Sequence, residues 1–404
     1  MNGPRTTWNF STAGRLIFGR GSVRELGPAA KRLGIDRVLI ITDAPLVTAG
    51  IVDRVADSLK ISDLRFEIFD GGEPEPSLEC AALAVDAARR FKPDATLGLG
   101  GGSNMDLAKI TAVVHTHGGD FADYFSWNNV PGPVCPIIAV PTTAGTGSEV
   151  SSAAVLSDRA NHIKVSTLSP YLRPAIAVVD PELTLTCPPK ATADSGIDAL
   201  THAIEAYVAT HSGDLDVPVG DIAPYEGKNP LTDCLAERAI ELVGQHLVTA
   251  VREPDNLAAR EGMSLAATLA GMAFSNAGVA LVHAMEYPLG GALHCSHGAG
   301  NGLLLPYVMR FNLPVRTSAM ANIARLLGEN VSGLEENVAA ERSITAVERL
   351  RAQIGIPPRI RDLGGTPDQL PEFAQKAFAI KRLMALTPRA PSEADILSIY
   401  HDAL

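Results

Sequence analysis

Four residues in the second half of the chain have the types and the spacing of a metal site. Asp198 and His202 lie four residues apart in GIDALTHAIEAY (196–207), a stretch that is otherwise mostly apolar. Because residues four apart on a helix point to the same side, both side chains can bind one ion. His283 and His297 follow, fourteen residues apart, in a second apolar region, GMAFSNAGVALVHAMEYPLGGALHCSHG (271–298).

One carboxylate and three neutral imidazoles form a suitable donor set for a divalent cation, and they leave coordination positions for a substrate. Each of these groups would be costly to bury without a partner. The pattern therefore predicts bound Fe²⁺ or Zn²⁺, although each histidine taken singly is more often a hydrogen-bonded core or surface residue.

Two details of this region are open to alternatives. His294 could replace His297 as a ligand; we favour His297 because SHG places it in a turn beside a glycine. We expect His283 to lie near the end of a very apolar helix that Pro288 helps to stop.

A glycine-rich loop in the first half could bind a dinucleotide. LGLGGGSNMDLAK (97–109) lies where a strand should pass into a helix, and backbone N–H groups at such a junction can hold a pyrophosphate. Gly100, Gly101 and Gly102 permit close approach, and Ser103 can add a hydroxyl. Since Ser103 replaces the third glycine of G-x-G-x-x-G, the loop alone fits a tight turn equally well.

Two further features support a cofactor site. VPTTAGTGSE (140–149) is a second small, hydroxyl-rich loop after another strand. Asp43 ends the run DRVLIITD (36–43), where a carboxylate could accept the ribose hydroxyls and would repel a 2′-phosphate. This favours NAD over NADP. The alternative for Asp43 is a helix cap or a turn residue.

The elements that must hold these residues differ between the two halves. Five short apolar runs alternate with helical stretches in the first half, at 36–43, 64–71, 95–102, 136–143 and 175–181. This rhythm predicts a parallel sheet with crossover helices, as in nucleotide-binding α/β domains. From about residue 188 such runs disappear, and stretches rich in Ala, Leu, Glu and Arg predict an all-helical region. We therefore expect a dinucleotide-binding α/β domain over 1–187 and a helical metal-binding domain over 188–404.

The start of the helical half and one long connection carry their own predictions. CPPKATADSG (187–196) offers Thr192 and Asp194 as possible N-caps before the helix with the first two ligands. HSGDLDVPVGDIAPYEGKNP (211–230) is rich in Gly, Pro and Asp and is long for a connection without secondary structure. A lid and a solvated surface insertion explain it equally well.

Composition excludes several classes of function. The formal charge of −11 would repel a phosphate backbone, and no basic stretch offsets it, so we expect no nucleic-acid partner. No apolar run has the length of a membrane span, and the N-terminus lacks the apolar core of a signal peptide. We therefore expect a cytoplasmic protein without a membrane partner. The five scattered cysteines predict reduced packing residues.

Five motifs together resemble the iron-containing (group III) alcohol dehydrogenase family. They are, in order, GGGSNMDLAK, IIAVPTTAGTGSEV, GIDALTHAIEAY, LVHAMEYPLG and SHGAGNGLLLPYVMRFN. The likeness runs from about residue 8 to the C-terminus. It implies a dehydroquinate synthase-like architecture, with an N-terminal Rossmann-like α/β domain, an all-α C-terminal domain, a metal-containing cleft between them, and a homodimer.

The resemblance also implies a role for individual residues. The ligands of Fe²⁺, with Zn²⁺ as the alternative, would be Asp198, His202, His283 and His297. The NAD pyrophosphate loop would be lined by Gly100, Gly101, Gly102, Ser103 and Asp106. Further cofactor contacts would come from Thr142, Thr143, Thr146, Lys164 on the ribose side and Phe274 near the nicotinamide.

The chain departs from the family pattern at two places. Many relatives have a second histidine four residues after the third ligand, and Tyr287 stands there, so a histidine proton relay is not carried over and Tyr287 joins His283 as a catalytic candidate. The usual Pro-Asn-Pro segment is PEPS (74–77), which leaves one cofactor contact open at Glu75. Tyr287 and the insertion are similar to the hydroxyacid-oxoacid transhydrogenase branch, whereas GNGLLLPYVMRFN resembles ordinary alcohol dehydrogenases.

The activity that the resemblance implies is hydride transfer between NAD and a primary alcohol or hydroxy acid, which gives the aldehyde or keto product. One alternative is a hydroxyacid-oxoacid transhydrogenase with tightly held NAD. Another is a non-redox enzyme similar to dehydroquinate synthase, although the ligand-helix region is short of the Lys and Arg that an acidic sugar would need. A third is a catalytically idle dimer.

Overall fold

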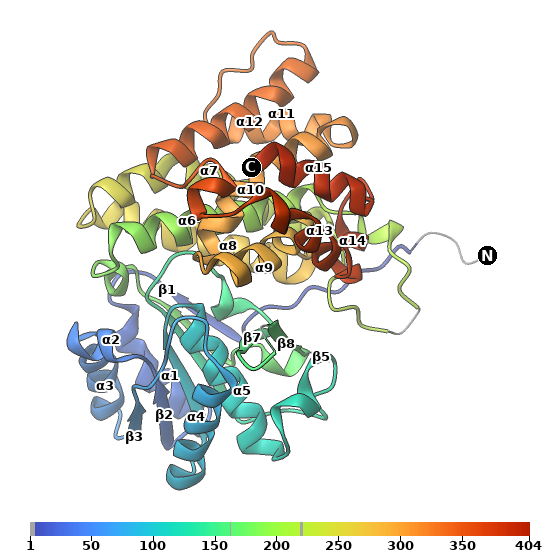
Figure 1. Ribbon diagram of the computed structural model, residues 1–404. Helices are drawn as coiled ribbons and strands as arrows, with labels where there is room; N and C mark the ends of the chain where they lie inside the picture. Colours follow the sequence, from blue (N-terminus) through green and yellow to red (C-terminus); the bar gives the residue numbers. More distant parts are fainter. Residues whose placement is uncertain (1–4, 162, 219–220) are drawn as a thin grey trace. The chain divides into compact units, whose positions relative to one another are not determined.

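The computed structural model describes residues 5–161, 163–218 and 221–404 (Figure 1). The chain divides into two compact units. One unit is Thr12–Cys187, and the other joins the N-terminal segment up to Ser11 to Pro188–Leu404. The N-terminal segment belongs to the helical unit because it bonds to it: the Ser11 N–H donates to Asn276 Oδ1 at 2.8 Å, and Arg5 pairs with Glu226 at 2.5 Å.

The first unit is built on a six-stranded sheet with the order β1-β9-β6-β4-β2-β3, in which every neighbouring pair is parallel. The strands are β1 (Arg15–Phe18), β2 (Arg37–Ile41), β3 (Arg65–Phe69), β4 (Ala95–Gly100), β6 (Ile137–Pro141) and β9 (Ile176–Val179). The five apolar runs are the last five of these strands. The predicted parallel sheet is confirmed.

Helices cover both faces of this sheet, because its central strands are apolar on both sides. They are α1 (Leu26–Arg32), α2 (Ala44–Thr48), α3 (Ile51–Ile61), α4 (Leu78–Phe91) and α5 (Gly102–His117). Along β2, Val38 and Ile40 join the core that contains α1 and α3, whereas Leu39 and Ile41 join the core that contains α4 and α5. Because successive side chains of a strand point to opposite faces, a strand that is buried on both faces has an uninterrupted apolar sequence.

A small second sheet in this unit was not predicted. It has the order β5 (Ser126–Trp127), β8 (Ile163–Leu168) and β7 (Ala153–Asp158), with β7 and β8 antiparallel. These strands are short and only partly buried, so their sequences lack a long apolar run. Polar contacts hold β7 to α5: the Val155 N–H donates to Asp106 Oδ2 at 3.0 Å, and Lys109 Nζ donates to the Ala153 carbonyl at 2.8 Å.

The second unit is helical, and the residues described in it contain no strand longer than an isolated bridge. The long helices are α6 (Pro189–Val208), α7 (Pro230–Arg252), α8 (Leu257–Ala277), α9 (Leu281–Leu293), α10 (His297–Asn312), α11 (Thr317–Leu326) and α12 (Glu336–Gln353), followed by α13 (Leu370–Phe378), α14 (Lys381–Leu386) and α15 (Glu393–Ala403). Helix α6 is buried along almost its whole length, as expected of a central helix that is apolar on most sides. The all-helical prediction is confirmed.

Three local predictions in this unit are wrong. Thr192 and Asp194 lie inside α6 rather than capping it, because the helix already starts at Pro189, whose fixed φ suits the first turn. The apolar region 271–298 is not one helix: α8 and α9 meet at a bend of 104°, where Gly278 has a φ of 101°. His283 therefore lies near the start of α9, and Pro288 lies within that helix.

The third correction concerns the next ligand candidate. His297 is the first residue of α10 rather than part of a loop, because the Ser296 side chain caps the helix by accepting from the Ala299 N–H. Among the described residues, no single helix is long and apolar enough to span a membrane, and the α8–α9 pair that passes this test together is sharply bent.

The ends of the segment 211–230 are tied together, apart from residues 219–220, which are not described. The Lys228 N–H donates to the Thr210 carbonyl at 2.9 Å, and the Ser212 N–H donates to the Lys228 carbonyl at 3.0 Å. Glu226 accepts from Asn9 of the N-terminal segment at 3.1 Å. The base of the segment is thus part of the helical unit, and its role as a lid stays a prediction.

Candidate active site

Three helices of the second unit bring the four predicted metal ligands together. Asp198 and His202 project from one side of α6, His283 comes from α9 and His297 from α10. The ligand atoms of Asp198, His202 and His283 all lie within 4.8 Å of one another. The Nε2 atoms of His283 and His297 lie 4.0 and 3.9 Å from Asp198 Oδ1.

These positions fit a divalent cation. Donor atoms that each lie about 2.0–2.2 Å from one ion are roughly 3–4 Å apart, and the distances of 4.0 and 3.9 Å from Asp198 Oδ1 to His283 Nε2 and His297 Nε2 lie at the upper end of that range. Burial alone would raise the pKa of Asp198, but attraction to the protonated forms of His202, His297 and His283, together with the hydrogen bond from Asn301, outweighs burial and lowers the pKa. His294, the alternative ligand, is an exposed residue at the end of α9 with a φ of 52°.

Two buried carboxylates fix the ring nitrogens of the histidines. Glu205 Oε2 accepts from His283 Nδ1 at 2.6 Å, and the same carboxylate accepts from the N–H groups of Ala280 at 2.9 Å and Val282 at 2.6 Å. Glu286 Oε2 is hydrogen-bonded to His297 Nδ1. With the proton on Nδ1, each ring presents the lone pair of Nε2 towards Asp198. This is the usual arrangement of a metal-binding histidine.

An amide completes the cluster. Asn301 Nδ2 donates to Asp198 Oδ1 at 2.8 Å and lies 3.2 Å from Nε2 of both His283 and His297. An amide donor at this distance from both Nε2 atoms agrees with the tautomers set by the carboxylates. The Asp198 oxygen and the two Nε2 atoms therefore all lie within 3.2 Å of the Asn301 amide nitrogen.

Sequence reasoning missed Glu205, Glu286 and Asn301, although their spacing contained a signal. Glu205 lies three residues after His202, Glu286 three after His283, and Asn301 four after His297. On a helix these intervals place a side chain beside the ligand. These intervals mark all three as candidates, but they do not show that Glu205 bonds His283 and Glu286 bonds His297, since each carboxylate bonds a histidine of another helix.

Aromatic rings stack on the outer two histidines. The rings of Phe274 and His202 stack with centroids 4.1 Å apart, and those of Tyr287 and His297 with centroids 6.0 Å apart. Phe274, predicted to lie near the nicotinamide, is thus placed against a metal-ligand candidate. Burial, followed by the nearby Tyr225, raises the pKa of Tyr287, so its hydroxyl carries a proton near neutral pH.

The predicted dinucleotide loops lie side by side in the first unit. The Thr142 N–H, at the end of β6, donates to the Gly100 carbonyl at 2.9 Å. A Cβ at Gly102 would lie 2.8 Å from the Thr146 side chain, and one at Gly101 would lie 3.7 Å from Thr143. Gly101 is also the N-cap of α5 and supplies no capping side chain. The structure thus brings both loops to the amino end of a sixteen-residue helix.

Asp43 is a helix cap, which is the structural role that the sequence analysis gave as its alternative to ribose binding. It is the N-cap of α2, and its Oδ1 accepts from the Leu46 N–H at 3.0 Å. Its Oδ2 accepts from Asn104 Nδ2 at 2.8 Å, which ties the carboxylate to α5 beside the glycine loop. The cap does not exclude a cofactor role, since the side chain remains at the carboxyl end of β2.

The side chain of Asp106 is held in a buried network. Its carboxylate accepts from Ser148 Oγ at 2.6 Å and lies 3.6 Å from Lys109 Nζ. Burial raises the pKa of Asp106 and lowers that of Lys109, and the attraction between the two opposes both shifts. This network joins α5 to η3 (Ser148–Val150) behind the loop.

Lys164 and Glu75 form one ion pair. Lys164 Nζ lies 2.8 Å from Glu75 Oε1, and the Glu75 N–H donates to Ser103 Oγ at 3.3 Å. Lys164, which was predicted to reach the ribose side of the cofactor, is therefore linked to Ser103 of the glycine loop through Glu75. Glu75 is the residue at which the chain departs from the usual Pro-Asn-Pro segment of the family.

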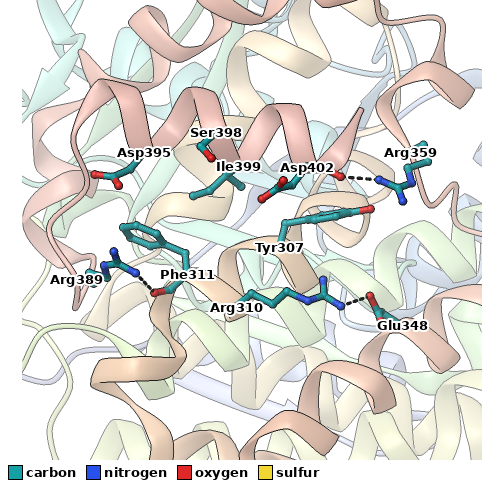
Figure 2. Close-up of a pocket in the computed structure, with 10 residues that line it drawn as sticks. All are labelled: Tyr307, Arg310, Phe311, Glu348, Arg359, Arg389, Asp395, Ser398, Ile399 and Asp402. Atoms are coloured by element: carbon teal, nitrogen blue, oxygen red, sulfur yellow. Dashed lines mark hydrogen bonds and ion pairs between the residues drawn. The ribbon is translucent and has the colours of Figure 1, made fainter.

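A separate pocket of about 560 Å³ lies on the helical unit, and the predicted site residues are not among those that line it (Figure 2). Its arginines are paired within the unit. Arg310 lies 2.6 Å from Glu348, Arg389 donates to the Phe311 carbonyl at 3.1 Å, and Arg359 donates to the carbonyl of Asp402 at 2.5 Å. Since acidic groups in the lining balance these charges, the pocket gives no sign of a charged ligand.

A parallel α/β unit with a glycine loop at a strand–helix junction, together with a helical unit that holds an Asp-His₃ cluster, is the combination that the sequence analysis expected of a metal-dependent dehydrogenase. The comparison with family models gives the same class. The model of the iron-containing alcohol dehydrogenases matches residues 13–181, and that of the C-terminal part of the Fe-containing alcohol dehydrogenase family matches residues 225–404.

Individual relatives agree over nearly the whole chain. The protein is 38% identical to the NAD-dependent methanol dehydrogenase of Bacillus methanolicus over 98% of this chain and 100% of the relative. It is 41% identical to long-chain-alcohol dehydrogenase 1 of Geobacillus thermodenitrificans over 96% of both. A crystal structure of 1,3-propanediol oxidoreductase matches with a TM-score of 0.92 and 36% identity over 98% of this chain and 100% of that chain. The chain belongs to the iron-containing alcohol dehydrogenase family, which confirms the resemblance.

Proposed function

We propose that this protein is an NAD-dependent alcohol oxidoreductase, which moves a hydride between an alcohol and the nicotinamide and forms the aldehyde or keto product. One observation carries the proposal: the ligand atoms of Asp198, His202 and His283 lie within 4.8 Å of one another and His297 Nε2 lies 3.9 Å from Asp198 Oδ1, in a chain whose relatives are named as alcohol dehydrogenases. A convergent set of this kind suits a cation that binds an alcohol oxygen.

The two units would divide the work, with a dinucleotide-binding α/β domain and a helical metal-binding domain that meet at residues 187 and 188. We infer that NAD places its pyrophosphate at the amino end of α5, against the backbone of Gly101, Gly102 and Ser103. Thr142, Thr143 and Thr146 add hydroxyls beside it. Asp43 supplies a negative charge that disfavours a 2′-phosphate. Asp106 would support the loop from its buried network.

Asp198, His202, His283 and His297 would hold the metal, for which we propose Fe²⁺, with Zn²⁺ as the alternative. When bound, a divalent cation polarises the alcohol oxygen and lowers its pKa. Glu205 keeps the His283 ring in the tautomer that presents Nε2. Tyr287, protonated near neutral pH, can donate a hydrogen bond but is a poor base. Hydride transfer then requires close alignment of the alcohol carbon and the nicotinamide ring.

For the substrate we propose a primary alcohol or a hydroxy acid. The named relatives act on methanol and long-chain alcohols, and a 1,3-propanediol dehydrogenase of Klebsiella pneumoniae is 37% identical over 96% of this chain. Tyr287 and the segment 211–230 favour, as a second candidate, a hydroxyacid-oxoacid transhydrogenase with tightly held NAD. We further propose a cytoplasmic homodimer without a membrane partner. Because the formal charge of −11 would repel a phosphate backbone, we also propose that it has no nucleic-acid partner.

The test is a panel of primary alcohols, diols and hydroxy acids, assayed with NAD after reconstitution with Fe²⁺ or Zn²⁺. A dehydrogenase accumulates NADH with an alcohol alone. A transhydrogenase forms product only when an oxo acid is added, without net NADH. Absence of both NADH accumulation and oxo-acid-dependent product formation with every substrate, in protein that binds both NAD and metal, would favour non-redox chemistry similar to that of dehydroquinate synthase.

A further inference from the structure

We propose that Glu286 is a positioning residue for the metal centre: its buried carboxylate orients His297 and increases the affinity of the donor set for a divalent cation. The inference rests on the proposed metal site. It concerns a side chain that none of the predicted roles includes.

His297 is the ligand candidate that most needs such a partner. Its side chain is 31% exposed, compared with 3% for His283 and 5% for His202. Because it is the first residue of α10, it lacks a preceding helical turn to pack against. Ser296 fixes the backbone there, since its Oγ donates to Asp194 Oδ2 at 2.6 Å. The orientation of the imidazole ring still depends on contacts of the side chain itself.

Glu286 supplies that contact from α9. It is fully buried and hydrogen-bonded to His297 Nδ1, which leaves Nε2 of this ring 3.9 Å from Asp198 Oδ1. The arrangement repeats the one between Glu205 and His283. A carboxylate that accepts the Nδ1 proton fixes the tautomer and makes the imidazole a stronger donor to a metal.

Two glycines provide the space for this carboxylate. A Cβ at Gly290 would lie 2.2 Å from Glu286 Oε1, and a Cβ at Gly300 would lie 2.8 Å from Glu286 Cγ. The neighbouring Gly291 faces open space, with no atom within 4 Å of its Cβ position. One glycine lies on α9 and the other on α10, so both helices are shaped around the side chain of Glu286.

The negative charges around the cluster also favour a role of Glu286 in metal binding. Asp198, Glu205 and Glu286 place three carboxylates in or directly beside the cluster, and a divalent cation offsets two of their charges. A buried negative charge without compensation is costly, which favours retention of the cation. Removal of the Glu286 charge should therefore weaken metal binding even where the ring stays in place.

The first test measures the affinity of the full-length protein for Zn²⁺ by competition with a chelator. Loss of a partner of this kind typically lowers metal affinity by about 10–100-fold, and we expect that loss in Glu286→Ala. Glu286→Gln keeps the length and an oxygen that can accept from His297 Nδ1 but lacks the charge, so we expect an intermediate affinity. The visible spectrum of the Co²⁺-substituted protein should change in Glu286→Ala, because the ligand field around the ion changes.

Unchanged Zn²⁺ affinity and an unchanged Co²⁺ spectrum in Glu286→Ala would overturn the proposal. Failure of the unsubstituted protein to bind Zn²⁺, Co²⁺ or Fe²⁺ would instead reject the proposed function, so the two failures are distinguishable.

The second test moves the carboxylate without removing its charge. Gly290→Ala should lower Zn²⁺ affinity, because the added methyl group collides with Glu286 Oε1. Gly291→Ala is the matched control, since it makes the same change one position along the same helix in open space. Both changes raise helix propensity similarly. Equal Zn²⁺ affinity in the two variants would contradict the proposal, and the pair remains informative if Glu286→Ala does not fold.

Discussion

The metal cluster of the helical unit and the glycine loops of the α/β unit are built in different ways. The cluster depends on side chains from three helices, and two of its histidines are held by a carboxylate of their own. The loops depend on backbone N–H groups and on residues with little or no side chain. A site made of side chains loses its ligand when a substitution removes one of those side chains. A site made of backbone N–H groups loses its ligand when a substitution adds a side chain that blocks close approach.

The largest expected effect is the loss of a ligand. His283→Ala should abolish metal retention and turnover together. The loss of metal affinity should exceed the roughly 100-fold upper value expected for a supporting residue such as Glu286. Metal content and NADH formation are measured on the same preparation. His294→Ala, which removes an exposed imidazole from the end of the same helix, should retain its metal. Full activity in His283→Ala would reject the assignment of the ligands.

A smaller but still large effect is expected at Glu205. Its carboxylate accepts from two backbone N–H groups at the start of α9 as well as from His283. Each buried donor left without a partner costs about 1–3 kcal/mol, so loss of the acceptor for these two N–H groups in Glu205→Ala should destabilise even the metal-free protein by about 2–6 kcal/mol. Denaturant unfolding of the apo protein measures this. A stability equal to that of Glu286→Ala would show that the two carboxylates do not differ in structural role.

The glycine loop should respond to an added methyl group. At Gly100 the φ is 143°, and a Cβ would lie 2.2 Å from Asn104 Nδ2. A strain of about 1–3 kcal/mol, relieved by displacement of the loop from its NAD-binding position, corresponds to roughly a 5- to 150-fold loss of NAD affinity in Gly100→Ala. Calorimetric titration with NAD measures the loss, while metal content should stay unchanged. Unchanged NAD affinity in Gly100→Ala would contradict the proposed position of the pyrophosphate.

The smallest effect is expected for the ion pair beside this loop. Glu75 and Lys164 are both accessible to solvent, and such pairs contribute about 0–1 kcal/mol. Glu75→Gln should therefore change the free energy of unfolding by less than about 1 kcal/mol, measured by denaturant. A change in NAD affinity greater than that of Gly100→Ala would assign the pair a direct role in cofactor binding.

Local pattern accounts for what could be predicted in both regions. Each predicted feature is contained in a sequence stretch of about a dozen residues or fewer. These features are the individual apolar runs of the parallel sheet, the glycine loop after β4 and the ligand pair on α6. Strand and helix periodicity act over that range. The prediction for the apolar region 271–298 was wrong because periodicity does not register a single left-handed residue. Gly278 ends one helix and so places His283 at the start of the next.

The sequence by itself determined the fold class, the family and the identity of the four ligand candidates, because apolar periodicity and short motifs encode them locally. Only the tertiary structure decided how those ligands are supported. Glu205, Glu286 and Asn301 are ordinary polar residues on helices until packing brings them against the histidines. Likewise Asp106 lies near the glycine loop in sequence, yet its carboxylate belongs to a buried network. The physical reason is that a buried polar group must find its partner across the core, and the distance along the chain does not reveal which partner that is.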